Sequence, residues 1–253
     1  EGTDFSLKEP NFCNNRELSR AEPIYEVNWG HDTKRYSPQN VSGLTKADVK
    51  KLELKWSFAF PNALRARSQP TISMGAVFVG SQDGRVYAFD LETGCTKWVF
   101  SASAEVRTGI VLSAPTDRSS EEGPPLAFFG DLLGRAYAVN ALTGELVWSI
   151  KTDDHPSTTL TGTPAYHQGV LLIPISSLEV VPAADPNYSC CSFRGSLLAV
   201  NGKTGKTKWR HYAVPEKPKI IGKTRLGTDI IAPSGAPIWT SPTIDPKRNL
   251  IYV

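Results

Sequence analysis

A fifteen-residue motif occurs three times in this chain. It reads GRVYAFDLETGCTKW at 84–98, GRAYAVNALTGELVW at 134–148 and GSLLAVNGKTGKTKW at 195–209. Each copy carries an alanine, an Asp or Asn, a Thr-Gly pair and a closing tryptophan at identical spacing, and Trp56 lies ahead of the first copy. Units of this size cannot bury both faces alone, so recurring copies predict an architecture in which each unit completes its core against the next.

Each unit is predicted to be a small antiparallel sheet. The apolar run Val86–Phe89 favours a short strand, and Thr93-Gly94 supplies the positive-φ turn that a tight hairpin needs before a second strand ends on the tryptophan. Further apolar strands precede the motifs, each opened by a proline, at Pro70, Pro164 and Pro242. We expect about four strands per unit, an all-β fold class and propeller-like blades. Helix is expected only as a short turn from Thr45 through Leu52 in a capping-box-like arrangement. The polar or proline-containing segments 117–125 and 182–192 are expected to be loops.

Composition narrows the possible partners. The chain has 253 residues, 40% of them hydrophobic, and a net charge of +3 that is scattered along the sequence. A weak, dispersed charge gives no argument for nucleic acid, and no apolar stretch approaches the length of a transmembrane segment. The only methionine is Met74 and the chain closes on the strand-like run 249–253. We therefore expect residues to precede Glu1 and the last strand to continue past Val253.

The eleven residues from Ala88 to Trp98 and their two copies resemble the tryptophan-docking motif of pyrroloquinoline quinone (PQQ) dehydrogenases. The segments WGHD at 29–32, RYSP at 35–38 and LKWSF at 54–58 are similar to that family as well. The resemblance implies an eight-bladed β-propeller in which each tryptophan stacks between neighbouring blades. By this reading 1–28 are an extended lead-in, and 29–253 are propeller blades that make up about the N-terminal half of the ring.

Within the family, three local patterns look most like the polyvinyl-alcohol dehydrogenase type. They are Thr93-Gly94-Cys95, Val106-Arg107 and the run CCSFRG at 190–195.

The resemblance also implies a cofactor segment. Thr159-Leu160-Thr161 followed by Ser176-Ser177-Leu178-Glu179 is similar to the family's PQQ-contacting segment, which ends in a glutamate that binds Ca²⁺. By that match Thr161, Ser176 and Ser177 contact PQQ, and Glu179 is a metal ligand, as suits a cation that prefers oxygen. The alternative is that Glu179 is a solvated loop carboxylate.

Two further residues match cofactor contacts of the family. Arg107 matches an arginine that contacts PQQ, and a guanidinium forks onto carboxylates. Trp239 lies outside the docking motif and matches the indole that forms the floor under the flat quinone. The alternatives are an ordinary surface arginine and a blade-packing tryptophan.

The adjacent pair Cys190-Cys191 is the most unusual local feature. In the family's alcohol dehydrogenases a vicinal disulfide packs on the PQQ face opposite the tryptophan, though it comes earlier in the chain than the pair does here. Four cysteines permit three pairings, and we favour Cys190 with Cys191 and Cys13 with Cys95 over separate bridges or free thiols. Either oxidised reading implies an oxidising compartment, periplasmic or secreted.

The function that follows from the resemblance is a Ca²⁺- and PQQ-dependent dehydrogenase for secondary alcohols, including polymeric ones, with cytochrome c as electron acceptor. The resemblance puts the catalytic Asp and a calcium-binding Asn beyond Val253. The sequence holds no Cys-x-x-Cys-His haem motif and no Gly-x-Gly-x-x-Gly. Two alternatives stay open: a dehydrogenase of sugars or aldehydes, and a non-catalytic β-propeller scaffold that binds protein partners.

Overall fold

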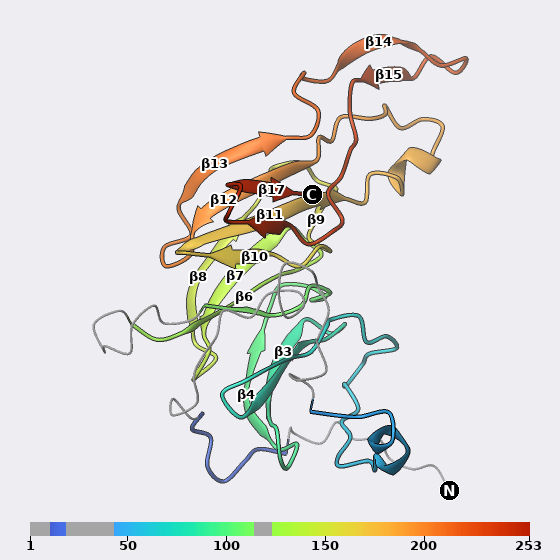
Figure 1. Ribbon diagram of the computed structural model, residues 1–253. Coiled ribbons are helices and arrows are strands. Elements are labelled where there is room, and N and C mark those ends of the chain that lie inside the picture. Colours follow the sequence, from blue (N-terminus) through green and yellow to red (C-terminus); the bar gives the residue numbers. More distant parts are fainter. Residues whose placement is uncertain (1–10, 19–42, 114–122) are drawn as a thin grey trace, which may run out of the picture.

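The computed structural model of this chain describes residues 11–18, 43–113 and 123–253, which form an almost purely β structure (Figure 1). The predicted motifs at 29–38, most of the lead-in 1–28 and most of a predicted loop at 117–125 lie outside the described residues. Within the described ranges, no helix combines the length and apolar character needed to cross a membrane.

The elements follow one another along the chain with short connections. The 3₁₀ helices are η1 (Asp48–Lys51) and η3 (Pro182–Ala184). The strands are β1 (Thr71–Ser73), β2 (Ala76–Gly80), β3 (Arg85–Asp90), β4 (Thr96–Ser101), β5 (Val111–Leu112), β6 (Leu126–Gly130), β7 (Arg135–Asn140), β8 (Leu146–Lys151), β9 (Thr158–Thr159), β10 (Ala165–His167), β11 (Val170–Ser177), β12 (Ser196–Asn201), β13 (Thr207–Tyr212), β14 (Lys219–Lys223), β15 (Asp229–Ala232), β16 (Thr243–Asp245) and β17 (Leu250–Tyr252).

The three motif copies each supply the last two strands of an antiparallel sheet, which confirms the predicted four-stranded unit. The first sheet has the order β1-β2-β3-β4, the second β5-β6-β7-β8 and the third β10-β11-β12-β13, with β9 added to β11. Prolines 70 and 164 stand directly ahead of β1 and β10. Along β1–β4, β5–β8 and β10–β13 each strand pairs antiparallel with the strand before it in sequence, and β9 is the exception because it pairs with β11.

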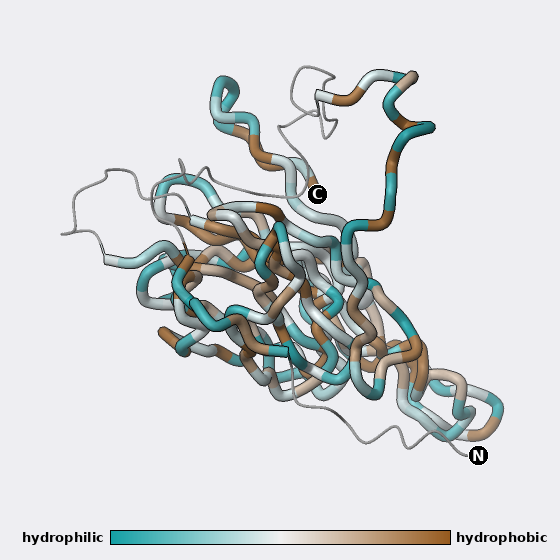
Figure 2. The backbone as a smooth tube through the Cα atoms, turned by 90° about the horizontal axis from the view of Figure 1, so that it is seen from below, coloured by the Kyte–Doolittle hydropathy of each residue, from teal (hydrophilic) through white to brown (hydrophobic). Residues whose placement is uncertain are grey.

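The hydrophobic cores lie between successive sheets. One cluster joins Phe78 and Val86 of the first sheet to Phe129 and Val139 of the second. A second cluster continues from Phe128 and its neighbours in the second sheet to the third, where β11 and β12 supply its largest aliphatic side chains. Figure 2 shows the hydrophobic stretches gathered in the packed strands. Each sheet therefore buries its faces only with the help of its neighbours, as the repeat predicted.

The motif tryptophans connect the sheets. Each docked indole stacks on the turn glycine of the next repeat and donates its N–H to a backbone carbonyl three residues before that glycine. The stacked pairs are Trp56 on Gly94, Trp98 on Gly144 and Trp148 on Gly205. The indole N–H groups donate to Leu91 O at 3.0 Å, Ala141 O at 3.0 Å and Gly202 O at 2.7 Å, in the same order. Glycine is required there for its positive φ and because a Cβ would enter the ring. The stacking that the resemblance implied between neighbouring units is confirmed at these three places.

Past the third sheet the chain forms two separate hairpins, β14–β15 and β16–β17. In Figure 1 the hairpin β14–β15 projects from the body, and β16–β17 lies beside the third sheet. Ile244 of β16 packs against the outer face of that sheet, in a cluster with Leu172 and Ile238. The sheets formed by the described residues do not close into a ring.

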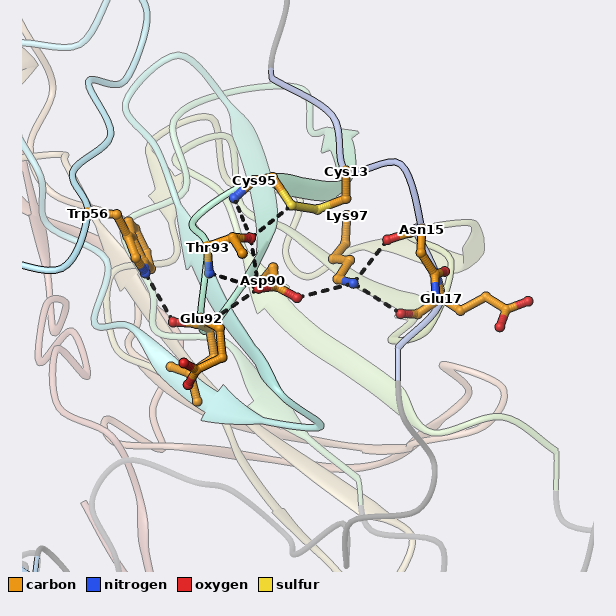
Figure 3. Close-up of polar contacts among 10 residues, drawn as sticks. Cys13, Asn15, Glu17, Trp56, Asp90, Glu92, Thr93, Cys95 and Lys97 are labelled. Carbon is orange, nitrogen blue, oxygen red and sulfur yellow. Dashed lines mark hydrogen bonds and ion pairs between the residues drawn. A yellow bond between two sulfur atoms is a disulfide. The ribbon is translucent and has the colours of Figure 1, made fainter.

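The N-terminal segment 11–18 is fixed to the first sheet. A disulfide joins Cys13 to Cys95, which confirms that predicted pairing, and Phe12 pairs in parallel with Thr96 of β4. The Lys97 ammonium donates to the carbonyls of Asn15 and Glu17 and pairs with Asp90 (Figure 3). The turn that carries Gly94, the docking site of Trp56, is therefore held from both sides.

The predicted helical turn at Thr45 is present in a shorter form. The helix η1 begins at Asp48, and Ala47 precedes it without a side-chain cap. The Thr45 hydroxyl and N–H both donate to Asp48 Oδ2, at 2.6 and 2.9 Å. The bond from Thr45 N–H to Asp48 Oδ2 is the reciprocal half of a capping box, whereas the Thr45 hydroxyl donates to the same carboxylate and makes no bond to a backbone N–H of η1.

Candidate functional site

Three predicted site residues occupy the same position in three successive sheets. In each case the residue before the site residue donates its N–H to a backbone carbonyl of the neighbouring sheet. The acceptor directly follows β2 or β6, or lies near the end of β11. The donors and acceptors are Val106 to Ser81, Leu160 to Asp131 and Ile238 to Ile175, at 3.0, 3.1 and 3.2 Å. The residues that follow are Arg107, Thr161 and Trp239. Equivalent positions in successive stacked sheets lie at the same end of the stack, so these side chains belong to one region of the molecule.

Close packing fixes these loops. A Cβ on Gly80 would lie 2.5 Å from the Val106 side chain, and one on Gly130 would lie 2.5 Å from Leu160. The glycines at the ends of β2 and β6 therefore leave the space that Val106 and Leu160 fill. The Gly109 N–H also donates to Thr163 Oγ1 at 2.8 Å, which ties the Arg107 loop to the Thr161 loop.

Buried hydroxyls without partners gather at the end of the third sheet. The side-chain oxygens of Thr159, Thr161 and Ser176 are buried and have no hydrogen-bond partner among the residues that the structure describes. Thr159 and Ser176 are directly opposite in the β9–β11 pair, so their side chains project to the same face. A buried hydroxyl that lacks a partner costs free energy, and such groups in one place indicate a site for a polar ligand.

The segment around Gly162 brings Trp239 to this place. A Cβ on Gly162 would lie 2.9 Å from the Trp239 carbonyl oxygen and 2.8 Å from the Pro174 ring. The Trp239 side chain is 50% exposed, unlike the docked tryptophans, so its ring face is open to a ligand. Arg107 is 21% exposed and forms a two-pronged ion pair with Glu105, in which Nε and Nη2 donate at 2.8 and 3.1 Å. Its Nη1 group takes no part in that pair.

Glu179 follows the end of β11 and is almost fully buried, with 5% of its surface exposed. Its own N–H donates to Ser177 Oγ at 2.9 Å, so Ser177, predicted to contact a cofactor, also shapes this turn. The Glu179 carboxylate accepts hydrogen bonds from Ser192 N at 2.8 Å, Phe193 N at 3.0 Å and Tyr188 Oη at 3.1 Å. Glu179 is therefore not the solvated loop carboxylate of the alternative reading, because it is buried and its oxygens are held by hydrogen bonds.

Two residues beside Glu179 were not predicted from the sequence. His155 Nε2 lies 3.5 Å from Glu179 Oε1, and the Tyr188 hydroxyl donates to the same oxygen. Burial, then the negative charge of Glu179 and the hydrogen bond to it, raise the pKa of Tyr188 above its ordinary value. Tyr188 lies two residues before the cysteine pair in sequence, and this proximity could have marked it as a candidate site residue. His155 is far from Glu179 in sequence, and no local pattern marks it.

The predicted vicinal disulfide is present: Cys190 is bonded to Cys191, and both are half-buried. The segment that carries it runs parallel to the end of the projecting hairpin. Cys191 N–H donates to Ile231 O at 3.1 Å, and Ile231 N–H donates to Cys190 O at 2.7 Å. The predicted loop at 182–192 is otherwise irregular apart from the short helix η3.

The described residues provide one candidate metal ligand, Glu179, and not a complete metal site. Within the described residues no group of three or more His, Cys, Asp or Glu side chains is placed to hold a metal ion. A calcium ion at Glu179 would need further oxygens from a ligand or from other parts of the protein.

Comparisons with known proteins identify the family to which this chain belongs. The family model "PQQ: Glucose/ethanol/alcohol dehydrogenase, beta-propeller domain" matches residues 26–253. A polyvinylalcohol dehydrogenase from Pseudomonas sp is 37% identical over 226 residues, which cover 89% of this chain and 35% of that protein. A second one, from Sphingopyxis sp. (strain 113P3), is 37% identical over 218 residues, covering 85% of this chain and 32% of its own length. The chain thus spans about a third of the length of these curated relatives.

Solved structures agree on the fold. The crystal structure of quinohemoprotein alcohol dehydrogenase from Comamonas testosteroni superposes with a TM-score of 0.61 at 23% identity, covering 82% of this chain and 31% of that one. The docked tryptophans, the stacked four-stranded sheets and the match over 26–253 lead to one conclusion: this chain belongs to the PQQ family of glucose, ethanol and alcohol dehydrogenase β-propeller domains.

Proposed function

We propose that this protein oxidises alcohols with PQQ as cofactor and Ca²⁺ as the bound cation, and that its sheets are blades of an eight-bladed propeller. By this proposal 29–253 contribute blades and 1–28 a lead-in. The observation that carries the proposal is the set of partnerless buried hydroxyls beside a half-exposed indole and a buried carboxylate. The family and the 37% identity to two polyvinylalcohol dehydrogenases support it.

The hydroxyls fit the cofactor. PQQ is a flat tricyclic molecule with carboxylates on its rim, and carboxylates accept hydrogen bonds from hydroxyl groups. Thr161 and Ser176 each have a buried hydroxyl to donate, and Ser177 keeps its own proton while its oxygen accepts from Glu179 N–H. In this proposal Thr161, Ser176 and Ser177 orient the cofactor by its carboxylates. Arg107 adds a charged contact through the part of its guanidinium that Glu105 leaves open.

The flat faces of the cofactor need flat or compact neighbours. Trp239 offers a half-exposed indole, and stacking on a planar ring adds to the free energy of burial. The disulfide Cys190–Cys191 provides a compact apolar surface on a segment that the hairpin β14–β15 supports. We assign these two groups to opposite faces of the quinone.

The cation is assigned to Glu179. When bound, PQQ with its Ca²⁺ ion supplies a polarised quinone carbonyl that takes a hydride from the alcohol. Glu179 holds a negative charge in a buried position without a Lys or Arg partner among the described residues, so a cation there is electrostatically favoured. We assign no catalytic base to the described residues.

We extend the proposal to substrate, acceptor and compartment. The relatives named polyvinylalcohol dehydrogenase support secondary alcohols, including polymeric ones, as substrates. Cytochrome c is the proposed electron acceptor. Two disulfides and the absence of free cysteines among the described residues support an oxidising compartment, periplasmic or secreted.

The test removes the hydroxyls without changing the shape of the site. Thr161→Val and Ser176→Ala in the intact protein each remove one proposed donor to PQQ. We expect each substitution to weaken PQQ binding by about tenfold, since a hydrogen bond to a charged group contributes about 1.5 kcal/mol or more. Binding is measured by the absorbance of the protein-bound quinone, and turnover by dye reduction with a secondary alcohol.

Thr96→Val is the matched control, because Thr96 Oγ1 is also buried without a partner but lies in β4 of the first sheet. The control should leave PQQ affinity unchanged. A wild-type protein that binds no PQQ in the presence of Ca²⁺, or equal losses in all three variants, contradicts the proposal.

A further inference from the structure

The Glu179 carboxylate is used unequally by its neighbours. Oε1 accepts from Ser192 N at 2.8 Å and Tyr188 Oη at 3.1 Å, with Ser192 Oγ and His155 Nε2 each 3.5 Å away. Among the described residues, Oε2 accepts a hydrogen bond only from Phe193 N, at 3.0 Å. A carboxylate oxygen has room for about two such contacts, so Oε1 is saturated and Oε2 is not.

His155 has a defined orientation and a defined tautomer. Ser157 N–H donates to His155 Nδ1 at 3.2 Å, so Nδ1 carries a lone pair and the proton of the neutral ring is on Nε2. Nε2 lies 3.0 Å from Ser192 Oγ and therefore donates to it. The Ser192 hydroxyl proton is then directed at Glu179 Oε1. The ring stands edge-on to the buried Phe193 ring, with centroids 5.4 Å apart, which prevents it from turning away.

The same contacts hold the vicinal disulfide. Ser192 and Phe193 directly follow Cys190-Cys191, and both give their N–H groups to Glu179. On its other side the cysteine pair is bonded to Ile231 at the end of the hairpin. The disulfide segment is therefore hydrogen-bonded to β15 on one side and to the buried Glu179 carboxylate on the other. The His155–Ser192 pair orients that carboxylate.

We propose that His155 is a positioning residue: by orienting Glu179 through Ser192 it commits Oε1 to the Cys190–Cys191 segment and leaves Oε2 to face a cation. The claim that His155 stabilises the disulfide segment follows from the contacts described above and does not depend on the proposed function. The part that concerns the cation rests on the proposed function. Removal of His155 should therefore loosen the disulfide segment and weaken the cation site together, although His155 touches neither sulfur nor metal.

The test compares three variants of the intact protein. His155→Phe keeps an aromatic ring against Phe193 and removes both nitrogens, whereas His155→Gln keeps an N–H donor near the position of Nε2. His211→Gln is the matched control, because His211 is an exposed histidine of β13 outside the site.

The first measurement is the rate of disulfide reduction by a limiting trialkylphosphine, followed by thiol alkylation and mass spectrometry. The phosphine supplies two electrons and takes the oxygen of one water, whose two protons go to the two thiols. We expect His155→Phe to speed reduction of Cys190–Cys191 about fivefold, the effect of losing one hydrogen bond between uncharged groups. Cys13–Cys95 is the internal reference and should be unaffected. His155→Gln should restore most of the protection, and His211→Gln should match the wild type.

The second measurement is Ca²⁺ affinity in the presence of PQQ, by titration calorimetry. We expect a loss of about tenfold or more in His155→Phe, as for other groups that orient a metal ligand. An unchanged reduction rate at Cys190–Cys191, or equal acceleration at both disulfides, would overturn the positioning role. A wild-type protein that binds no Ca²⁺ would overturn the proposed metal site instead, while the reduction rates still decide the role of His155.

Discussion

Trp148 and Trp209 close two copies of one sequence motif, yet their surroundings differ. Trp148 is 8% exposed, stacks on Gly205 and donates to Gly202 O. Trp209 is 41% exposed and borders an open groove of about 410 Å³ beside the hairpin β16–β17. The motif itself therefore does not bury its tryptophan. Burial belongs to the pair of units, since each tryptophan needs the turn of the following repeat to cover it.

The largest expected effect tests this difference directly. Trp148→Ala should lower the free energy of unfolding by about 3 to 5 kcal/mol, because it empties a docked interface in the middle of the stack. Trp209→Ala should change it by less than about 1 kcal/mol, as a largely solvent-facing substitution does. Both values come from urea unfolding of the 253-residue chain, in whose sequence no further copy of the motif follows Trp209. Equal losses would mean that Trp209 is covered in solution and would remove the distinction.

A smaller effect is expected from filling the space under an indole. Gly144→Ala places a Cβ 2.8 Å from Trp98 Cδ2 at a residue with φ of +76°. Gly169→Ala is the control, because its φ is +80° but a Cβ there meets nothing within 4 Å. The control substitution should lower the free energy of unfolding by about 1 to 2 kcal/mol, because alanine must adopt a left-handed backbone conformation there. Gly144→Ala should cost at least another 1 kcal/mol or so for displacing the ring. Both variants are measured by thermal and urea unfolding. Equal losses of stability in Gly144→Ala and Gly169→Ala would show that Trp98 packs as well on alanine as on glycine.

The smallest effect separates the first docking turn from the next two. At the position before the turn, the first repeat has Asp90 where the others have Asn140 and Asn201. Burial alone would raise the pKa of Asp90, but hydrogen bonds from the Thr93 hydroxyl and N–H and the contact with Lys97 outweigh it and hold that pKa below its ordinary value. A lowered pKa gives stability that is present above the unfolded-state pKa near 4 and is lost as the pH falls through the folded-state value.

We therefore expect wild-type stability to fall more steeply between about pH 4 and pH 2 than that of Asp90→Asn, because only the wild type must protonate this carboxylate. Urea midpoints measured across that range for both proteins give the comparison. Parallel curves would show that Asp90 adds no pH dependence to the first interface.

Much of the fold could be predicted from the sequence because its determinants are local. Apolar runs, Thr-Gly turns and prolines define the strands within each motif, and the repeat defines the stacking. The helical turn at Thr45 was confirmed with one half of the predicted capping box, the bond from Thr45 N–H to Asp48, and without the other half, a bond from the helix N–H groups to the Thr45 hydroxyl. The five-strand third sheet was not expected, since β9 is only two residues long.

The candidate site could be predicted from the sequence less completely than the fold. Arg107, Thr161 and Trp239 lie at equivalent positions, but loops of different length separate each from its preceding motif tryptophan, so no constant spacing reveals the match. The role of His155 arises from contacts across the sheet end, and the partnerless hydroxyl of Thr159 from its register opposite Ser176. These are properties of packing, which a sequence pattern does not record.

The most direct test of the account is a crystal structure of the intact protein grown with PQQ and Ca²⁺. The account predicts the quinone between Trp239 and the Cys190–Cys191 disulfide, with its carboxylates at Thr161 and Ser176 and the cation at Glu179 Oε2. A quinone bound elsewhere, with those two hydroxyls still without partners and Glu179 touching only the protein, would contradict it.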